Sequence, residues 1–92
     1  MNKNFVIYGE GLNKNLTLRM KKTVFCKIDG QKIIMEKSNS IVDAVTYRRM
    51  LNIVRENKGS FHNTRYTDLG FAPMRMAIGD SEEETIYDFE IV

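Results

Sequence analysis

Hydrophobic and polar residues alternate along much of this chain, which is the pattern of strands with one buried face. Runs that alternate or are rich in β-branched and aromatic residues predict strands at Asn4–Tyr8, Leu16–Met20, Phe61–Thr67, Met74–Ile78 and Thr85–Val92. Two lysines at positions 21 and 22 interrupt the alternation, so we expect the second of these strands to end before them.

The clearest local signal is a β-hairpin centred on Asp29-Gly30. The flanking segments Thr23–Ile28 and Gln31–Glu36 read as strands, and Asp-Gly is typical of a two-residue type I′ turn. This turn fixes a register in which Lys27 lies opposite Lys32. The face expected in the core holds Val24, Cys26, Ile28, Ile33 and Met35, and the other face holds Phe25, Lys27, Lys32 and Ile34.

One amphipathic helix is expected from Ile41 to Lys58. Ser40 and Asp43 have the spacing of a capping box, and Gly59 is a typical helix end. With successive residues turned by about 100°, an apolar stripe faces the sheet: Ala44, Tyr47, Met50, Leu51 and Val54. A second stripe is polar and basic: Arg48, Asn52 and Arg55, with Arg49 beside them.

These elements follow the order ββββ-α-βββ with short connections, which indicates an α+β fold. We expect a mainly antiparallel sheet of about six or seven short strands with one helix packed on it. Residues 1–92 fit a single compact domain without linkers. No run has the length of a membrane span or a signal peptide, and the one cysteine, Cys26, cannot form an internal disulfide. We therefore expect a cytoplasmic protein, in the host cell's cytoplasm if it is encoded by a phage.

The formal net charge of +2 conceals an uneven distribution. Residues 1–79 carry a charge of +8 and residues 80–92 a charge of −6. In the last strand Asp88 and Glu90 alternate with Tyr87, Phe89 and Ile91. Two interpretations follow: the carboxylates cover the lysine pair of the hairpin, or the last strand is an open edge that pairs through its apolar residues with a second copy or another protein.

Patterns for catalysis and metal binding are weak. One His and one Cys cannot supply the ligands of a structural zinc, no cofactor motif is complete, and Glu82–Glu84 reads as a solvated charge run. His62, Arg65 and Tyr66 have the residue types of a metal-independent ribonuclease, although neighbouring strand residues alternate between faces. We expect no metal and no cofactor, and the sequence favours binding over catalysis.

The residues best suited to bind phosphates or a partner are Lys27, Lys32, Arg48, Arg49, Asn52 and Arg55. They match no defined nucleic-acid-binding motif. In style, a short Lys- and Asn-rich domain without catalytic residues is similar to small accessory proteins of bacteriophages and mobile elements, which act by occupying a surface.

The sequence therefore favours a non-catalytic binding protein, an inhibitor or modulator that blocks a host nucleic-acid-handling or defence factor by contacting RNA, DNA or that protein. Two alternatives stay open. One is a small ribonuclease that uses His62, Arg65 and Tyr66. The other is a self-assembling structural or regulatory module, a homo-oligomer joined through Tyr87, Phe89 and Ile91 of the last strand.

Overall fold

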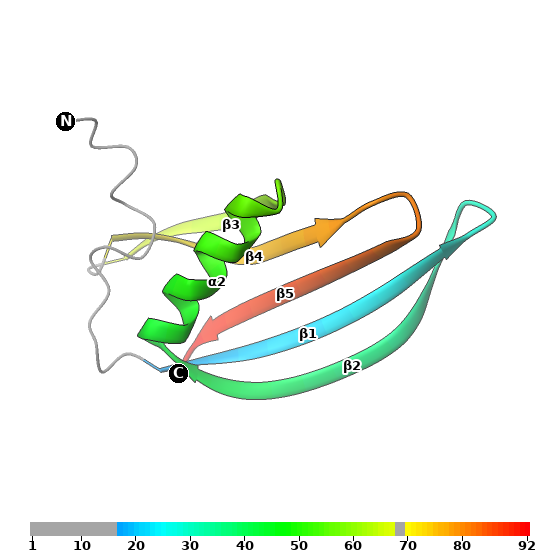
Figure 1. Ribbon diagram of the computed structural model, residues 1–92. Helices are drawn as coiled ribbons and strands as arrows, with labels where there is room; N and C mark the ends of the chain where they lie inside the picture. Colours follow the sequence, from blue (N-terminus) through cyan, green and yellow to red (C-terminus); the bar gives the residue numbers. More distant parts are fainter. Residues whose placement is uncertain (1–16, 68–69) are drawn as a thin grey trace.

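The computed structural model describes residues 17–67 and 70–92, which form five strands and one helix (Figure 1). The strand expected at Asn4–Tyr8 lies outside the described residues. In chain order the elements are β1 (Thr17–Ile28), β2 (Gln31–Asp43), α2 (Ala44–Glu56), β3 (Ser60–Thr67), β4 (Gly70–Gly79) and β5 (Glu83–Ile91).

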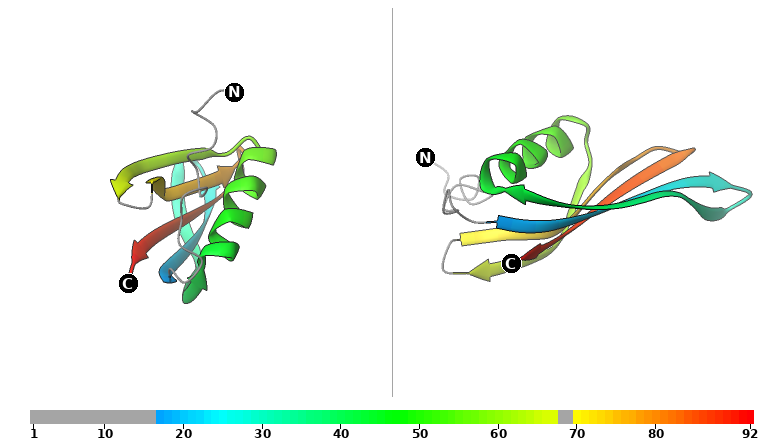
Figure 2. Two further views of the ribbon diagram at one scale, coloured as in Figure 1. Left: turned by 90° about the vertical axis from the view of Figure 1, so that its left-hand side faces the viewer. Right: turned by 90° about the horizontal axis from the view of Figure 1, so that it is seen from below.

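The five strands form one antiparallel sheet in the order β2-β1-β5-β4-β3. α2 lies across one face of this sheet, and no other described element covers the opposite face (Figure 2). The α+β class, the antiparallel sheet and the single packed helix are therefore confirmed. β5, the last strand in the sequence, lies in the centre of the sheet between β1 and β4.

The described strands number fewer than expected because β1 continues through Lys21 and Lys22. These two lysines keep the alternation. Lys21 lies on the open face, whereas Lys22 lies on the helix side, where its Nζ is 3.9 Å from a carboxylate oxygen of Glu36 on β2. A lysine can occupy such a half-covered position because its aliphatic stem packs while its ammonium group reaches solvent.

The Asp29-Gly30 turn is confirmed. Both residues have positive φ, 49° and 77°, as a type I′ turn requires. The expected register holds from the turn to the pair Phe25 and Ile34. Beyond that pair the expected register, which continues without a shift, is wrong. Val24 lies opposite Glu36, because Met35 is an extra, bulged residue on β2.

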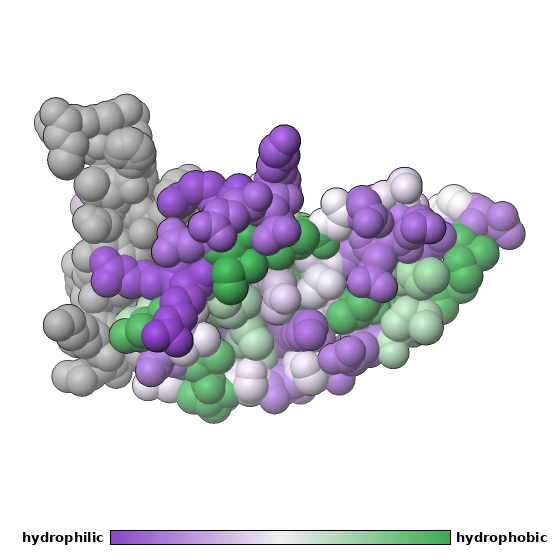
Figure 3. All heavy atoms as spheres, viewed as in Figure 1, coloured by the Kyte–Doolittle hydropathy of each residue, from purple (hydrophilic) through white to green (hydrophobic). Residues whose placement is uncertain are grey.

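The expected hairpin core is wrong in its outer part. Ile28, Ile33 and Met35 are 49%, 44% and 64% exposed, while Val24 and Cys26 are half-buried. The physical reason is that the hairpin extends beyond the end of the sheet that α2 covers (Figure 1). Hydrophobic surface accordingly gathers over this end of the hairpin (Figure 3).

The helix begins three residues later than expected. β2 continues to Asp43, so Ser40 and Ile41 belong to the strand and Ser40 cannot cap a helix. Asp43 is the N-cap instead, and its Oδ1 accepts a hydrogen bond of 2.8 Å from the backbone N–H of Thr46. The helix ends with Glu56, and Asn57 is its C-cap.

The core lies between the apolar stripe of α2 and the strands beneath it. Tyr47, Leu51 and Val54 are each at most 1% exposed, which confirms the predicted stripe. The Tyr47 ring meets the Phe89 ring edge to face at 5.0 Å between centroids, and the Tyr47 hydroxyl donates a hydrogen bond to the Pro73 carbonyl at 2.8 Å. One helix residue thus contacts both β5 and β4. Within the described ranges, no helix is long and apolar enough to cross a membrane.

Leu51→Ala should lower the free energy of unfolding by about 2–5 kcal/mol, because it opens a cavity beneath α2. Ile53→Ala is the matched control on the same helix, since Ile53 is 49% exposed and should cost less than about 1 kcal/mol. Urea denaturation followed by circular dichroism measures both. Equal losses in the two variants would contradict the described placement of the helix.

Candidate functional site

The exposed side of α2 carries four of the six predicted binding residues. Arg48, Arg49, Asn52 and Arg55 are all exposed, because the opposite stripe of the helix packs on the sheet. Arg55 Nη1 lies 3.4 Å from Asn52 Oδ1 and donates to it, which links two members of the polar stripe. The structure therefore brings these four residues together on one surface, here called the arginine face.

The sequence of α2 places few carboxylates near the arginine face. None of its three arginines has a carboxylate three or four residues away, which is where helical ion pairs form. The one acidic residue within the helix is Glu56, at its last position. Asp43 at the N-cap is near enough for the charge of Arg49 to help lower its pKa, but the main cause of that lowering is the hydrogen bond from Thr46.

The other two predicted residues, Lys27 and Lys32, lie elsewhere. They face each other across the hairpin as expected, on the side of the sheet away from α2. Lys27 Nζ donates a 2.8 Å hydrogen bond to the Asp80 carbonyl oxygen, and Lys32 Nζ donates a 2.7 Å hydrogen bond to Glu84 Oε1. Lys32 also lies 5.7 Å from the centroid of the Phe25 ring. The six predicted residues are thus divided between two surfaces.

The acidic end of the chain balances the open face of the sheet, but with partners that differ from those expected. Glu84, rather than Asp88 or Glu90, meets the lysine pair. Asp88 instead accepts a 2.7 Å hydrogen bond from Arg75 Nε on β4. Glu90 pairs with Arg19 on β1, with 2.5 Å between Oε1 and Nη1. These partners follow from the register of β5 between its two neighbours.

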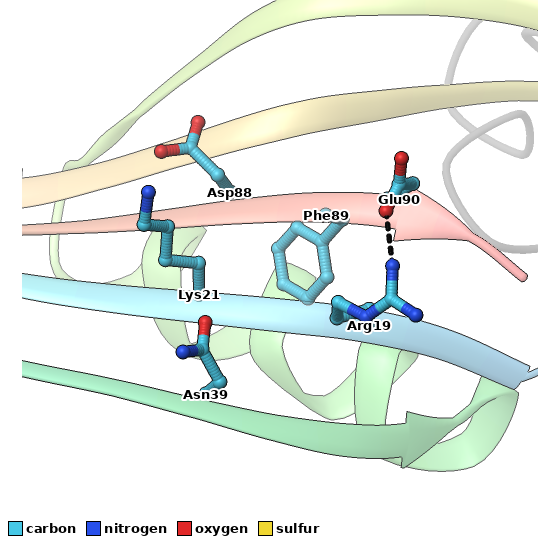
Figure 4. Close-up of a pocket in the computed structure, with 6 residues that line it drawn as sticks. All are labelled: Arg19, Lys21, Asn39, Asp88, Phe89 and Glu90. Carbon is cyan, nitrogen blue, oxygen red and sulfur yellow. Dashed lines mark hydrogen bonds and ion pairs between the residues drawn. The ribbon is translucent and has the colours of Figure 1, made fainter.

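A shallow depression of about 360 Å³ lies beside the Arg19–Glu90 pair (Figure 4). Its polar rim also includes Lys21, which extends toward Asp88, and Asn39 of β2. Because both signs of charge line it and a carboxylate already meets its arginine, the depression offers an anion no surplus of positive charge. The depression is therefore less suitable for binding phosphates than the arginine face.

The hypothesis of an open edge at the last strand is wrong. β5 pairs with β1 from Glu83 to Ile91 and with β4 from Glu84 to Asp88, so it is an inner strand of the described sheet and not an edge strand. Phe89 is buried beneath α2, and Tyr87 and Ile91 are half-buried against the core. The open edges of the described sheet belong to β2 and β3.

The three residues of the ribonuclease alternative are not assembled into one site. His62 lies opposite Arg75 on the open face, whereas Arg65 lies opposite Ala72, whose side chain is on the core side. His62 forms a hydrogen bond with Ser60 instead, with 2.8 Å between Ser60 Oγ and His62 Nε2. Among the described residues, no group of three His, Cys, Asp or Glu side chains is placed to hold a metal ion.

Two carboxylates on the open side, those of Asp80 and Glu84, accept hydrogen bonds that stabilise the turn after β4 and its contact with the hairpin. The hydrogen bond from Lys32 lowers the pKa of Glu84 below its ordinary value. The backbone N–H groups of Glu82 and Glu83 donate to Asp80 Oδ1 at 2.8 and 2.9 Å, and they lower the pKa of Asp80. Sequence reasoning missed both contacts, although Asp80 before Ser81 has the form of an Asx turn.

Stability should fall in acid, because the pKa values of Asp43, Asp80 and Glu84 are all lowered by folding. A carboxyl whose pKa is lower in the folded state stabilises the protein above its unfolded pKa of about 4, and this stabilisation disappears as the pH falls through the folded pKa. The free energy of unfolding, measured with urea from pH 7 to pH 3, should decrease below about pH 4. The double variant Asp43→Asn and Asp80→Asn should show a shallower decrease, since Asn still caps a helix but does not titrate. An unchanged pH dependence in that variant would contradict the assignment.

The chain was compared with protein families, with curated proteins and with solved structures. No family model matches it, and neither a curated protein nor a solved structure is significantly similar to it. A function must therefore be argued from the geometry and charge of the two surfaces described above.

Proposed function

We propose that this protein is a non-catalytic binding protein that docks on the phosphates of a nucleic acid through the arginine face of α2. One observation carries the proposal. Four cations of the open sheet face meet oxygen atoms from the turn after β4 and from β5. On the other side of the sheet, three arginines and Asn52 lie together on the exposed side of α2. Three guanidinium groups are thus concentrated on one exposed helix face.

The chemistry of this face suits phosphate oxygens. A guanidinium group presents planar donors that can bind two oxygens of one phosphate, and it stays charged at all physiological pH values. From Arg48 to Arg55 the helix rises about 10 Å, a length over which a duplex strand presents about three phosphates. Asn52, between them, adds an amide that can donate to a phosphate or a base edge.

Binding of this kind needs no acid, base or metal. By covering the backbone of RNA or DNA, the protein would keep a host nucleic-acid-handling or defence factor from the same stretch, as an inhibitor or modulator. This role is in keeping with the style of small phage and mobile-element proteins noted above. The same arginines could instead dock on an acidic surface of the host factor itself. The experiment below distinguishes the two possibilities, because it measures binding to nucleic acid alone.

The triple variant Arg48→Ala, Arg49→Ala and Arg55→Ala should lose most of the affinity for labelled RNA or DNA oligonucleotides in fluorescence anisotropy. For the unmodified protein, the logarithm of the association constant should fall linearly with the logarithm of salt concentration. The slope of that line should shrink in the variant by about 2 to 3, because each phosphate contact contributes about 0.7–0.9.

The matched control removes three positive charges from the other side of the molecule, by Lys27→Ala, Lys32→Ala and Lys37→Ala. It should keep the slope of the unmodified protein, because these lysines lie on the face opposite α2. Equal losses in the two triple variants would show a diffuse charge effect and refute the arginine face. Binding too weak to detect with every oligonucleotide would refute the nucleic-acid version and leave a protein target.

A further inference from the structure

β2 is an unusually open edge strand. It is 13 residues long and has no buried residue, and β1 is its one partner among the described strands. Four of its apolar side chains are 44% to 64% exposed: Ile33, Ile34, Met35 and Ile41. A long edge strand with unpaired backbone groups and exposed apolar side chains is a template for another strand, and proteins usually shorten, charge or cover such edges.

We propose that β2 pairs antiparallel with β2 of a second copy of this chain, about a twofold axis that passes through Ser38. The two five-stranded sheets then join into one continuous sheet. This inference depends on the edge alone and not on nucleic-acid binding. The pairing places Lys32 opposite Asp43, Ile33 opposite Val42 and Ile34 opposite Ile41, each of them twice because of the symmetry.

The bulge at Met35 decides which residues meet in this register. Side chains on the two sides of a joined sheet must match, and on β2 the open face holds Lys32, Ile34 and Ile41, while Ile33 and Val42 lie on the helix side. In a regular strand Ile34 would share a face with Val42 and would lie opposite it across an axis through Ser38. The extra residue shifts the outer half of the strand by one position, so that Ile34 meets Ile41 and the faces agree.

A register that places side chains of the same face opposite each other also aligns the backbone N–H and C=O groups of the two strands. Side chains and backbone polar groups both alternate with a period of two along a strand. Residues whose side chains share the open face of β2 therefore also share the direction of their N–H and C=O groups. Pairing them with one another lets the donors and acceptors of the two edges meet.

Neighbouring registers that keep the faces matched are much poorer. An axis through Lys37 places that lysine opposite its own copy, and directly opposed like charges destabilise a strand pair. An axis through Asn39 places Ile34 opposite Asp43 and Lys37 opposite Ile41. The axis through Ser38 sets apolar residues against apolar residues and a cation against an anion, which supports a second copy as the occupant of this edge.

Disulfide cross-linking tests the register directly. In a Cys26→Ser background, Ser38→Cys should form a covalent dimer rapidly under mild oxidation, because residues opposite each other across antiparallel strands have Cα atoms about 4.5–5.5 Å apart. Ser40→Cys is the matched control on the same face. Its two copies would be offset by four residues, about 14 Å along the strand, which is beyond the reach of a disulfide. Equal cross-linking of the two variants, or none with Ser38→Cys, would overturn the proposal.

Sedimentation equilibrium provides a second, independent measurement. The unmodified protein should approach twice its monomer mass as its concentration rises, and Ile41→Lys should weaken this association by about tenfold or more. Ile53→Lys should leave it unchanged, because Ile53 is similarly exposed but lies on α2. A protein that stays monomeric at every concentration would refute a second copy as the occupant of the β2 edge.

Discussion

The rest of the structure depends on the insertion of β5 between β1 and β4. The β1–β2 hairpin and the β3–β4 hairpin do not pair with each other, and β5 is the strand that joins them into one sheet. The same strand brings Phe89 under Tyr47, so it also supplies part of the surface on which α2 packs. β5 is an inner strand, which leaves β2 and β3 as the edge strands of the described sheet.

This insertion also explains where the charges of the molecule end up. The acidic residues concentrated at the end of the sequence are carried into the middle of a sheet whose flanking strands are basic. Glu84, Asp88 and Glu90 each meet a cation from a different strand: Lys32 on β2, Arg75 on β4 and Arg19 on β1. Three cations of the open sheet face thereby meet carboxylates, whereas the arginines of α2 are on the other side of the sheet from these carboxylates.

Features set by local chemistry could be predicted from the sequence. Asp29-Gly30 determines its own turn and the four residue pairs next to it, and the apolar stripe of α2 determines which of its residues face solvent. The exposure of Arg48, Asn52 and Arg55 followed from that stripe. Features set by distant pairing could not be predicted in this way. Ser40 has a capping sequence, but its pairing with Met20 keeps it in a strand, so Asp43 begins the helix.

The same distinction holds for the candidate sites. The opposition of Lys27 and Lys32 is local and was predicted, but their partners Asp80 and Glu84 depend on how β5 aligns with β1 about sixty residues away in sequence, a separation that no local pattern encodes. The bulge at Met35 likewise could not be predicted from the alternation of polar and apolar residues, because one extra residue in such a run resembles an ordinary interruption of the alternation. It matters because it decides which residues of the β2 edge share a face.

The central position of β5 has a consequence for biosynthesis. During translation, the two hairpins leave the ribosome before the strand that joins them, and until then each exposes strand edges that the finished sheet covers. The inner edges of β1 and β4 are therefore open to wrong pairing until β5 pairs with them. A nascent chain of this kind depends on the prompt arrival of β5, and a chain broken before residue 83 would retain two hairpins without the strand that joins them into one sheet.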